Sequence, residues 1–319
     1  MKILVTGGAG FIGSHIVEHF QNLAEVRVLD NLRSGFKENL AGLKCQFLEC
    51  SILDRPAVRE AMRGVDFVFH LAAMVSVPES MQKLVECNEI NASGTLVILE
   101  EAARAGVKKL VFSSSAAIYG ANPVVPKTET MLPEPQSAYA ITKLDGEFYC
   151  KLFAAEGRLP TVCLRYFNVF GPRQNPKSQY AAAVPLFIDR ALQHEPITIF
   201  GDGEQTRDFI FVKAVVAANA FLATNPHATG VFNVAGGKRI SINHLAEKIC
   251  RLVASPSEIR HAAERPGDIK HSLASVDKLS TLGFHAAGEF DHDLRATVDF
   301  FEHRLPSASP ARHLPVTSR

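Results

Sequence analysis

The sequence predicts an α/β fold, a doubly wound parallel sheet that carries a smaller C-terminal α/β lobe. Three observations lead to this prediction. Short β-branched runs alternate with segments of helical period through the first half of the chain. A glycine-rich turn follows directly after the first of these runs. After residue 168 the pattern changes to shorter elements separated by glycine and proline turns.

The apolar runs are short and nearly continuous, which is typical of strands buried on both faces of a parallel sheet. The predicted strands are residues 2–6, 26–30, 46–48, 66–71, 109–113 and 161–166. Helical patterns lie between them, with Asp54 as the expected cap of the second one. These predicted helices are residues 12–23, 56–63, 81–105 and 137–156. Such alternation favours right-handed crossovers.

The second half of the chain predicts a smaller lobe. Its helical patterns lie at residues 182–193, 212–223 and 241–253. We expect residues 1–167 to form the large unit and residues 168–304 to form mainly the lobe, with the two interleaved. Such a lobe closes over the carboxyl ends of the strands, where open α/β sheets bind ligands. Residues 305–319 are rich in Pro, Ser, Ala and Arg and predict a flexible tail.

Composition narrows the function classes. The 319 residues carry 34 basic and 33 acidic side chains, a net charge of +1, so no nucleic-acid or membrane partner is expected. Apolar residues make up 47%, enough for a substantial core, yet no apolar stretch reaches membrane-spanning length. The six cysteines form no CxxC pair, and neither they nor the histidines show metal-ligand spacing. We therefore expect a cytoplasmic protein without a metal.

A glycine-rich turn joins the first predicted strand to the first predicted helix. Its spacing is Gly7-x-x-Gly10-x-x-Gly13, and Gly8 adds an overlapping GxGxxG pattern. Glycines permit a tight turn and let backbone N–H groups approach a pyrophosphate at the helix N-terminus. Since strand, turn and helix occur in the right order, the segment predicts a Rossmann-type dinucleotide-binding unit rather than a purely structural turn.

An acidic residue ends the second predicted strand. Asp30 stands 20 residues after Gly10, where a carboxylate accepts hydrogen bonds from the adenosine ribose and repels a 2′-phosphate. The position predicts NAD as the cofactor. Arg33 follows closely and, as a cation near this site, leaves NADP open as the alternative.

A tyrosine and a lysine lie four residues apart in the helical pattern 137–156. Tyr139 and Lys143 therefore project from one helix face, and three serines end the strand predicted at 109–113. A phenol has a pKa near ~10, and a neighbouring ammonium is expected to lower that pKa toward neutrality. The tyrosine then acts as a base, with a serine hydroxyl as relay. An isolated pair with this spacing is more often surface chemistry, so the interpretation depends on the dinucleotide turn.

These motifs resemble those of the extended short-chain dehydrogenase/reductase superfamily and, within it, the UDP-hexose 4-epimerases. The similarity is greatest to the epimerases that act on UDP-N-acetylglucosamine. The segments that carry the resemblance cover nearly the whole chain short of its tail. They are residues 6–15, 69–73, 112–120, 139–143, 164–171, 207–212 and 265–272.

The resemblance implies a chemical role for each motif. Tyr139 is the expected base, Lys143 its modulator and the anchor of the nicotinamide ribose, and Ser115 the hydroxyl partner, with Ser114 as a second candidate. The sugar is expected to pass through a 4-keto intermediate, and NAD to stay bound between turnovers. The residues expected to bind the cofactor are Gly7, Gly10, Phe11, Ile12, Gly13, Asp30, Asn31, Ser34, Gly35, Ser51, Ile52, Leu71, Ala72, Ala73, Tyr139, Lys143 and Tyr166.

Two segments depart from the family pattern. Where relatives often carry an aspartate that contacts adenine, this chain has Ser51, which we expect to make a weaker contact. Where relatives carry aspartates after Phe211, it has Lys213 and Ala214, which affects loop anchoring and not the chemistry.

Comparison with the family's motifs favours epimerisation over the superfamily's other reactions. In the 4,6-dehydratases and UDP-glucuronate decarboxylases of the superfamily, an acidic residue precedes the tyrosine that matches Tyr119. This chain has Ala116 and Ala117 there, and alanine transfers no proton. Epimerisation requires no such acid. A net NAD-dependent oxidoreductase that acts on a nucleotide sugar remains an alternative.

The resemblance also suggests the sugar. A small residue at the position of Ser272 leaves room for an acetamido group, so UDP-GlcNAc and UDP-GalNAc are the expected substrates. A larger pocket does not strongly reject UDP-glucose and UDP-galactose. A UDP-glucuronate or UDP-galacturonate 4-epimerase is the alternative. Arginine forks match phosphate oxygens, which makes Arg207 and Arg265 the candidates for the diphosphate, although both could instead form structural ion pairs.

The remaining expectations concern other contacts of the substrate and the assembly. Relatives dimerise through two long helices, here residues 81–105 and 137–156, so a homodimer is expected. The full set of residues expected to bind the UDP-sugar is Ser76, Ser114, Ser115, Asn168, Ala182, Arg207, Arg265, Asp268 and Ser272.

Overall fold

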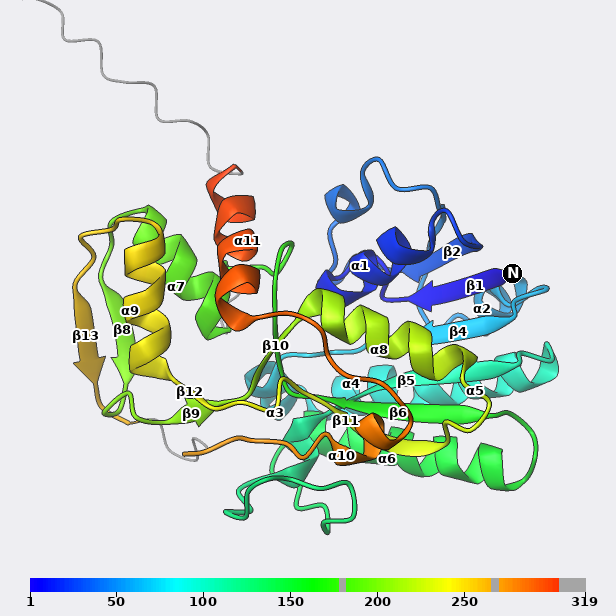
Figure 1. The fold of residues 1–319 in the computed structure, drawn as a ribbon. Coiled ribbons are helices and arrows are strands. Elements are labelled where there is room, and N and C mark those ends of the chain that lie inside the picture. The colour runs from blue at the N-terminus through cyan, green and yellow to red at the C-terminus, as the bar shows by residue number, and fades with distance from the viewer. Residues whose placement is uncertain (178–181, 265–269, 304–319) are drawn as a thin grey trace, which may run out of the picture.

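A seven-stranded parallel sheet forms the centre of the molecule (Figure 1). The computed structural model describes residues 1–177, 182–264 and 270–303. Within them, the order of the strands in the sheet is β11-β6-β5-β4-β1-β2-β3. Their bounds are β1 Lys2–Thr6, β2 Glu25–Asp30, β3 Gln46–Glu49, β4 Phe67–His70, β5 Lys109–Ser115, β6 Thr161–Tyr166 and β11 Gly230–Val234. The predicted doubly wound fold is confirmed, and every predicted strand is present with small shifts at its ends.

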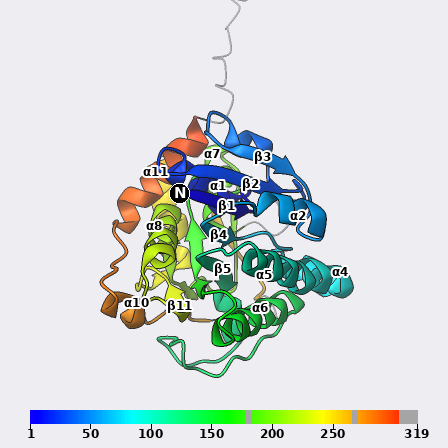
Figure 2. The same cartoon turned by 90° about the vertical axis from the view of Figure 1, so that its right-hand side faces the viewer.

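Helices cover both faces of this sheet (Figure 2). One face carries α1 (Phe11–Phe20) and α8 (Val212–Thr224), and the other carries α2 (Arg55–Ala61), α5 (Gly94–Arg104) and α6 (Ala138–Ala155). Because successive side chains of a strand point to opposite faces, β1 contributes to two cores. Ile3 and Val5 pack in the core beneath α1 and α8, whereas Leu4 packs in the core beneath α2 and α5.

Capping residues determine where the helices beside the site begin. Asp54 caps α2 by accepting the Ala57 N–H at 3.1 Å, as expected. Ser137 caps α6 by accepting the Ala140 N–H at 3.2 Å. The second cap places Tyr139 in the first turn of α6, beside the carboxyl end of β5.

The single helix predicted at residues 81–105 is not found. The chain instead forms α3 (Val77–Gln82), α4 (Leu84–Asn88), a π-helical turn and then α5. Lys83 interrupts the first pair with φ −126° and ψ 58°. In the π-helical turn, Asn91 accepts the Met74 N–H at 2.7 Å and donates to the Met74 carbonyl at 3.1 Å. These long-range bonds, which helical periodicity cannot reveal, hold the irregular turn against the sheet.

A smaller lobe lies beside the carboxyl ends of the strands (Figure 1). Its core joins α7, α9 and α11 to the parallel pair β8–β13. The bounds are α7 Ala183–Leu192, β8 Ile197–Phe200, α9 Ile242–Leu252, β13 Ile259–Ala262 and α11 Phe290–Glu302. Short pairs connect the lobe to the sheet: β7 (Asn168–Phe170) with β10 (Phe209–Phe211), and β9 (Thr206–Arg207) with β12 (Ile240–Ser241).

The chain returns from this lobe to the large sheet. After β10 it forms α8 on one face of the sheet and then β11, the edge strand next to β6. Residues on both sides of position 168 therefore build the large sheet. Among the described residues, none of the helices has the length and apolar character needed to cross a membrane.

Candidate active site

A cavity of about 510 Å³ opens at the carboxyl ends of the strands. It lies where the strand order reverses between β1 and β4, the place where doubly wound sheets bind ligands. All of the residues predicted to bind the cofactor line this cavity, and so do Ser114, Ser115 and Ala182. The structure therefore brings the glycine turn, Asp30 and the tyrosine–lysine pair to one site.

The glycine turn is packed too tightly to accept side chains. Gly7 has φ +71°, and a Cβ atom on it would lie 2.7 Å from the Ala72 nitrogen. A Cβ atom on Gly13 would lie 2.2 Å from the Gly7 carbonyl oxygen. Gly10 is the N-cap of α1 and has no side-chain capping bond, so the helix N-terminus faces the cavity without a side chain across it. This cradle fits a pyrophosphate.

Asp30 is fixed at the end of β2. Its Oδ2 accepts the Ala9 N–H at 3.0 Å, and its Oδ1 accepts the Leu32 N–H at 2.8 Å. Burial raises the pKa of this carboxyl, and the two backbone bonds oppose the rise. Each oxygen keeps a further lone pair for a ribose hydroxyl. The residues present therefore fit NAD.

The catalytic candidates meet beneath the other end of the cavity. The Lys143 ammonium donates to the Ser113 carbonyl at 2.7 Å and lies 5.9 Å from the centre of the Tyr139 ring. Ser115 accepts the Ala117 N–H at 3.1 Å and hydrogen-bonds the Tyr139 side chain. The Tyr139 backbone N–H donates to Ser80 Oγ of α3 at 3.1 Å, which joins the first turn of α6 to α3.

The pKa values of this pair differ from the expectation. Burial raises the pKa of the Tyr139 phenol, and only the hydrogen bond with Ser115 lowers it. Burial also lowers the pKa of Lys143 from 10.5 to about 8. The expected lowering of the phenol pKa by Lys143 is not found, because desolvation of Tyr139 dominates and the Lys143 ammonium donates instead to the Ser113 carbonyl.

The structure distinguishes between the two candidate serines. Ser114 Oγ donates to Glu147 Oε1 at 2.6 Å, and both side chains are buried. Glu147 in turn binds Arg165, beneath the sheet end. Ser115 is the serine that pairs with Tyr139, so it stays the candidate for the hydroxyl partner, while the hydroxyl of Ser114 is bound to Glu147 in the core.

Among the described residues, four predicted substrate residues lie outside the cavity lining: Ser76, Asn168, Arg207 and Ser272. Asn168 donates to the Asp208 carbonyl at 3.2 Å, and Arg207 donates to the Thr206 carbonyl at 3.1 Å. Ser272 donates its backbone N–H to the Thr206 carbonyl, also at 3.1 Å. These three lie around the β9 segment, on the side of the smaller lobe.

Ser76 precedes α3, away from the β9 segment in the chain. Ser76 is the N-cap of α3 and accepts the Glu79 N–H at 3.2 Å, so its hydroxyl is engaged in starting this helix. Arg265 and Asp268 lie outside the described residues.

Gln174 is a cavity residue that sequence reasoning did not single out. Its Nε2 donates to the Val169 carbonyl at 3.1 Å, whereas its Oε1 is buried and has no hydrogen-bond partner among the residues that the structure describes. An unpaired acceptor at a cavity wall suits a ligand that donates a hydrogen bond. Its only signal in the sequence is a polar side chain within residues 165–174, and the backbone bond to Val169 could not be read from it.

Several known proteins are similar to this chain in sequence and in fold. Residues 3–235 match the model of the NAD dependent epimerase/dehydratase family. A UDP-glucose 4-epimerase of Mycolicibacterium smegmatis is 35% identical, with 95% of this chain and 99% of the relative covered. A solved UDP-N-acetylglucosamine 4-epimerase from Methanobrevibacter ruminantium, in complex with UDP-N-acetylmuramic acid, is 41% identical with a TM-score of 0.92, covering 95% and 99% of the two chains. The Thermus thermophilus UDP-glucose 4-epimerase in complex with NAD is 36% identical with a TM-score of 0.88, covering 96% and 100%.

Proposed function

The chain belongs to the NAD dependent epimerase/dehydratase family and is an NAD-dependent UDP-sugar 4-epimerase, and from this premise we propose that it interconverts UDP-GlcNAc and UDP-GalNAc. UDP-glucose and UDP-galactose are proposed as a second, slower pair of substrates. One observation carries the proposal: Tyr139, Ser115 and Lys143 meet at one end of a cavity whose other end is the NAD cradle.

The reaction type is supported by the charges around the cavity. Among the described residues that line it, Asp30 is the only carboxylate, and it lies at the adenosine end. Ala116 and Ala117 follow Ser115 in a 3₁₀ turn and offer no proton-transfer group. A dehydratase requires an acid and a base beside the sugar. The lining of this end of the cavity therefore favours epimerisation over dehydration.

The proposed mechanism moves one proton at the sugar. Bound NAD supplies reversible oxidation and reduction at C4. Tyr139 Oη removes the proton of the C4 hydroxyl, and Ser115 Oγ orients that hydroxyl and shares the proton. Lys143 places a positive charge beneath the phenol and holds the end of β5 through the Ser113 carbonyl. After the 4-keto sugar has turned its other face, Tyr139 returns the proton.

The preference for N-acetyl sugars rests on small residues. Ala182 lines the cavity, and Ser272 stands beside β9 in the smaller lobe. Neither side chain is large enough to fill the space that an acetamido group requires. The unpaired oxygen of Gln174 is a suitable acceptor for a donor on the ligand.

A uronate substrate is less well supported by the cavity. Of the described residues that line it, Arg33 and Lys143 are the cations. Arg33 is paired with two glutamates, and Lys143 donates to a backbone carbonyl. A sugar carboxylate would meet no cation available for pairing among these residues.

A homodimer is proposed on the basis of an exposed apolar surface. On α6 the exposed residues Ile141, Phe148 and Leu152 recur at helical spacing. The neighbouring α3 and α4, which pack on α6, add Met81 and Val85, which are 52% and 74% exposed. Contiguous apolar patches of this kind mark interfaces. All six cysteines are free, which fits the reducing cytoplasm as the proposed location.

The direct test is a comparison of substrates. Purified protein is incubated separately with UDP-GlcNAc, UDP-glucose and UDP-glucuronate without added NAD, and the epimers are separated by chromatography. We expect equilibration of UDP-GlcNAc, slower equilibration of UDP-glucose and none of UDP-glucuronate. Turnover of the uronate alone would contradict the proposed substrate, and a strict requirement for added NAD would favour a net oxidoreductase.

A further inference from the structure

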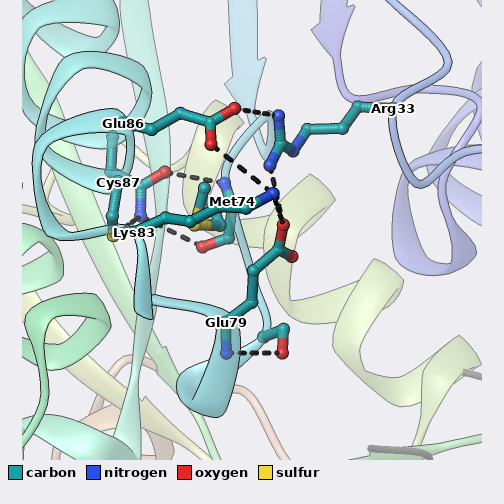
Figure 3. Close-up of polar contacts among 8 residues, drawn as sticks. Arg33, Met74, Glu79, Lys83, Glu86 and Cys87 are labelled. Atoms are coloured by element: carbon teal, nitrogen blue, oxygen red, sulfur yellow. Dashed lines mark hydrogen bonds and ion pairs between the residues drawn. The ribbon is translucent and has the colours of Figure 1, made fainter. Parts of the chain in front are cut away.

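Arg33 lines the cavity near Asp30 and binds two glutamates that lie outside the cavity lining. Its Nη2 donates to Glu79 Oε1 at 2.8 Å, and its Nη1 donates to Glu86 Oε1. Arg33 follows β2, whereas Glu79 belongs to α3 and Glu86 to α4. Figure 3 shows the arginine side chain extending from its loop toward these two carboxylates. Both arms of the guanidinium are therefore engaged by carboxylates of α3 and α4.

Lys83 completes this group, which we call the Arg33 clasp (Arg33, Glu79, Lys83 and Glu86). Its ammonium lies 3.1 Å from Glu79 Oε1 and 3.7 Å from Glu86 Oε2. Hydrogen bonds within the clasp lower the pKa of both glutamates. The bond from Lys83 has the largest effect on the pKa of Glu79, and the bond from Arg33 has the largest effect on that of Glu86. Both acids are thus ionised at neutral pH. Two cations and two anions make the clasp locally neutral.

The clasp lies beside the residue that recognises the ribose. Arg33 and Asp30 line the same cavity and follow one another closely in the loop after β2. A 2′-phosphate on the adenosine ribose would need a cation here, and an arginine fork is the group that best matches phosphate oxygens. Of the described residues that line the cavity, Arg33 is the only arginine.

We propose that Glu79 and Glu86 are specificity-determining residues that exclude NADP by occupying Arg33. The inference rests on the proposed function, because it concerns the cofactor of the same site. To pair with Arg33, a 2′-phosphate must displace two carboxylates and approach their negative charges as well as that of Asp30. Asp30 repels the phosphate directly, and the glutamates withhold the cation that would compensate. Specificity of this kind arises from an unfavourable arrangement for the wrong ligand.

The test is the double variant Glu79→Gln/Glu86→Gln of the full chain. Cofactor-depleted protein is titrated with NAD and with NADP, and the ratio of the two Kd values is compared with that of the wild type. We expect the preference for NAD to fall about tenfold in the double variant, because one arginine–phosphate pair becomes available. An unchanged ratio, with NAD still bound, would overturn the inference.

The triple variant Arg33→Ala/Glu79→Gln/Glu86→Gln is the matched control. It removes the same two negative charges but also the arginine, so the preference for NAD should return most of the way to the wild-type value, with Lys83 as the one cation left in the clasp. An equal fall in the double and triple variants would show that loss of the glutamates acts without Arg33, and would also overturn the inference.

Two further measurements keep the test decisive. The dinucleotides that remain in the purified proteins are released with acid and separated, and the NADP fraction should rise only in the double variant. If the double variant does not fold, Glu86→Gln alone, which keeps the contacts between Glu79 and Lys83, should show a smaller shift in the same direction, and no shift would count against the clasp. Wild-type protein that binds neither dinucleotide would instead contradict the proposed function.

Discussion

The Glu147 carboxylate binds the Arg165 guanidinium through two hydrogen bonds, of 2.8 and 2.7 Å, at side chains that are 5% and 4% exposed. The same carboxylate accepts the Ser114 hydroxyl, one residue before Ser115, the proposed hydroxyl partner of Tyr139. The pair therefore holds the end of β5 on α6 and β6, the elements that carry the chemistry.

Glu147→Gln should lower the free energy of unfolding by about 3 kcal/mol, because it leaves the buried Arg165 charge without an anion. Urea unfolding followed by circular dichroism measures the change. The exposed pair Glu156–Arg158 offers a matched control, since Glu156→Gln should change stability by less than about 0.5 kcal/mol. Similar losses in the two variants would contradict the structural role of the buried pair.

Tyr139→Phe should reduce kcat for epimerisation by about 10³-fold while leaving the retained NAD unchanged, because only the proton-transferring oxygen is lost. The assay is equilibration of UDP-GlcNAc together with the dinucleotide content of the protein. Tyr149→Phe, on the same helix but outside the cavity lining, is the control and should keep wild-type turnover. Full activity of Tyr139→Phe would remove the proposed base.

Lys143 is a buried cation whose charge opposes folding. Its pKa falls from 10.5 to about 8 in the folded protein, so the unfolded chain binds more protons between these values, and stability should rise as the pH increases from 8 to 10.5. Lys143→Met should therefore be more stable than the wild type at pH 7, by about 2 kcal/mol after loss of the bond to Ser113. Urea midpoints at pH 7 and pH 10 give the comparison, and an advantage that does not shrink at pH 10 would contradict the assignment. The same variant should lose most of its turnover.

Gly13→Ala should abolish retention of NAD, since its Cβ would lie 2.2 Å from the Gly7 carbonyl oxygen and would push the turn apart. Gly42→Ala is the appropriate control. Gly42 has φ +76° with no atom within 4 Å of the added Cβ and lies outside the cavity lining, so its substitution imposes backbone strain alone. The dinucleotide content of the two purified proteins, measured by absorbance after acid release, should differ clearly.

Ser272→Tyr should suppress turnover of UDP-GlcNAc and spare that of UDP-glucose, because a phenol ring takes the space proposed for the acetamido group. The ratio of kcat/KM for the two sugars is the measurement. Ser272→Thr adds only a methyl group and should keep both activities. Equal losses on the two substrates in Ser272→Tyr would show that this position does not select the sugar.

The sequence predicted the parts of this site that depend on local pattern. The glycine turn, Asp30 at the end of the next strand and the Tyr139–Lys143 pair each have a local spacing, so these patterns taken together located the site. The parts that depend on distant contacts were not predictable. The break near Lys83, the unpaired oxygen of Gln174 and the raised pKa of Tyr139 all follow from residues that meet only in the folded chain.

The position of β11 has a consequence for synthesis of the protein on the ribosome. The large sheet receives its edge strand only after the chain has passed through β8, β9 and β10, so β6 has no partner on that side until residue 234 has emerged. A nascent chain exposes the open edge of β6 during this interval, and unpaired edges invite aggregation. A fragment that ends at residue 167 retains this open edge permanently and is a poor choice for producing the nucleotide-binding part alone.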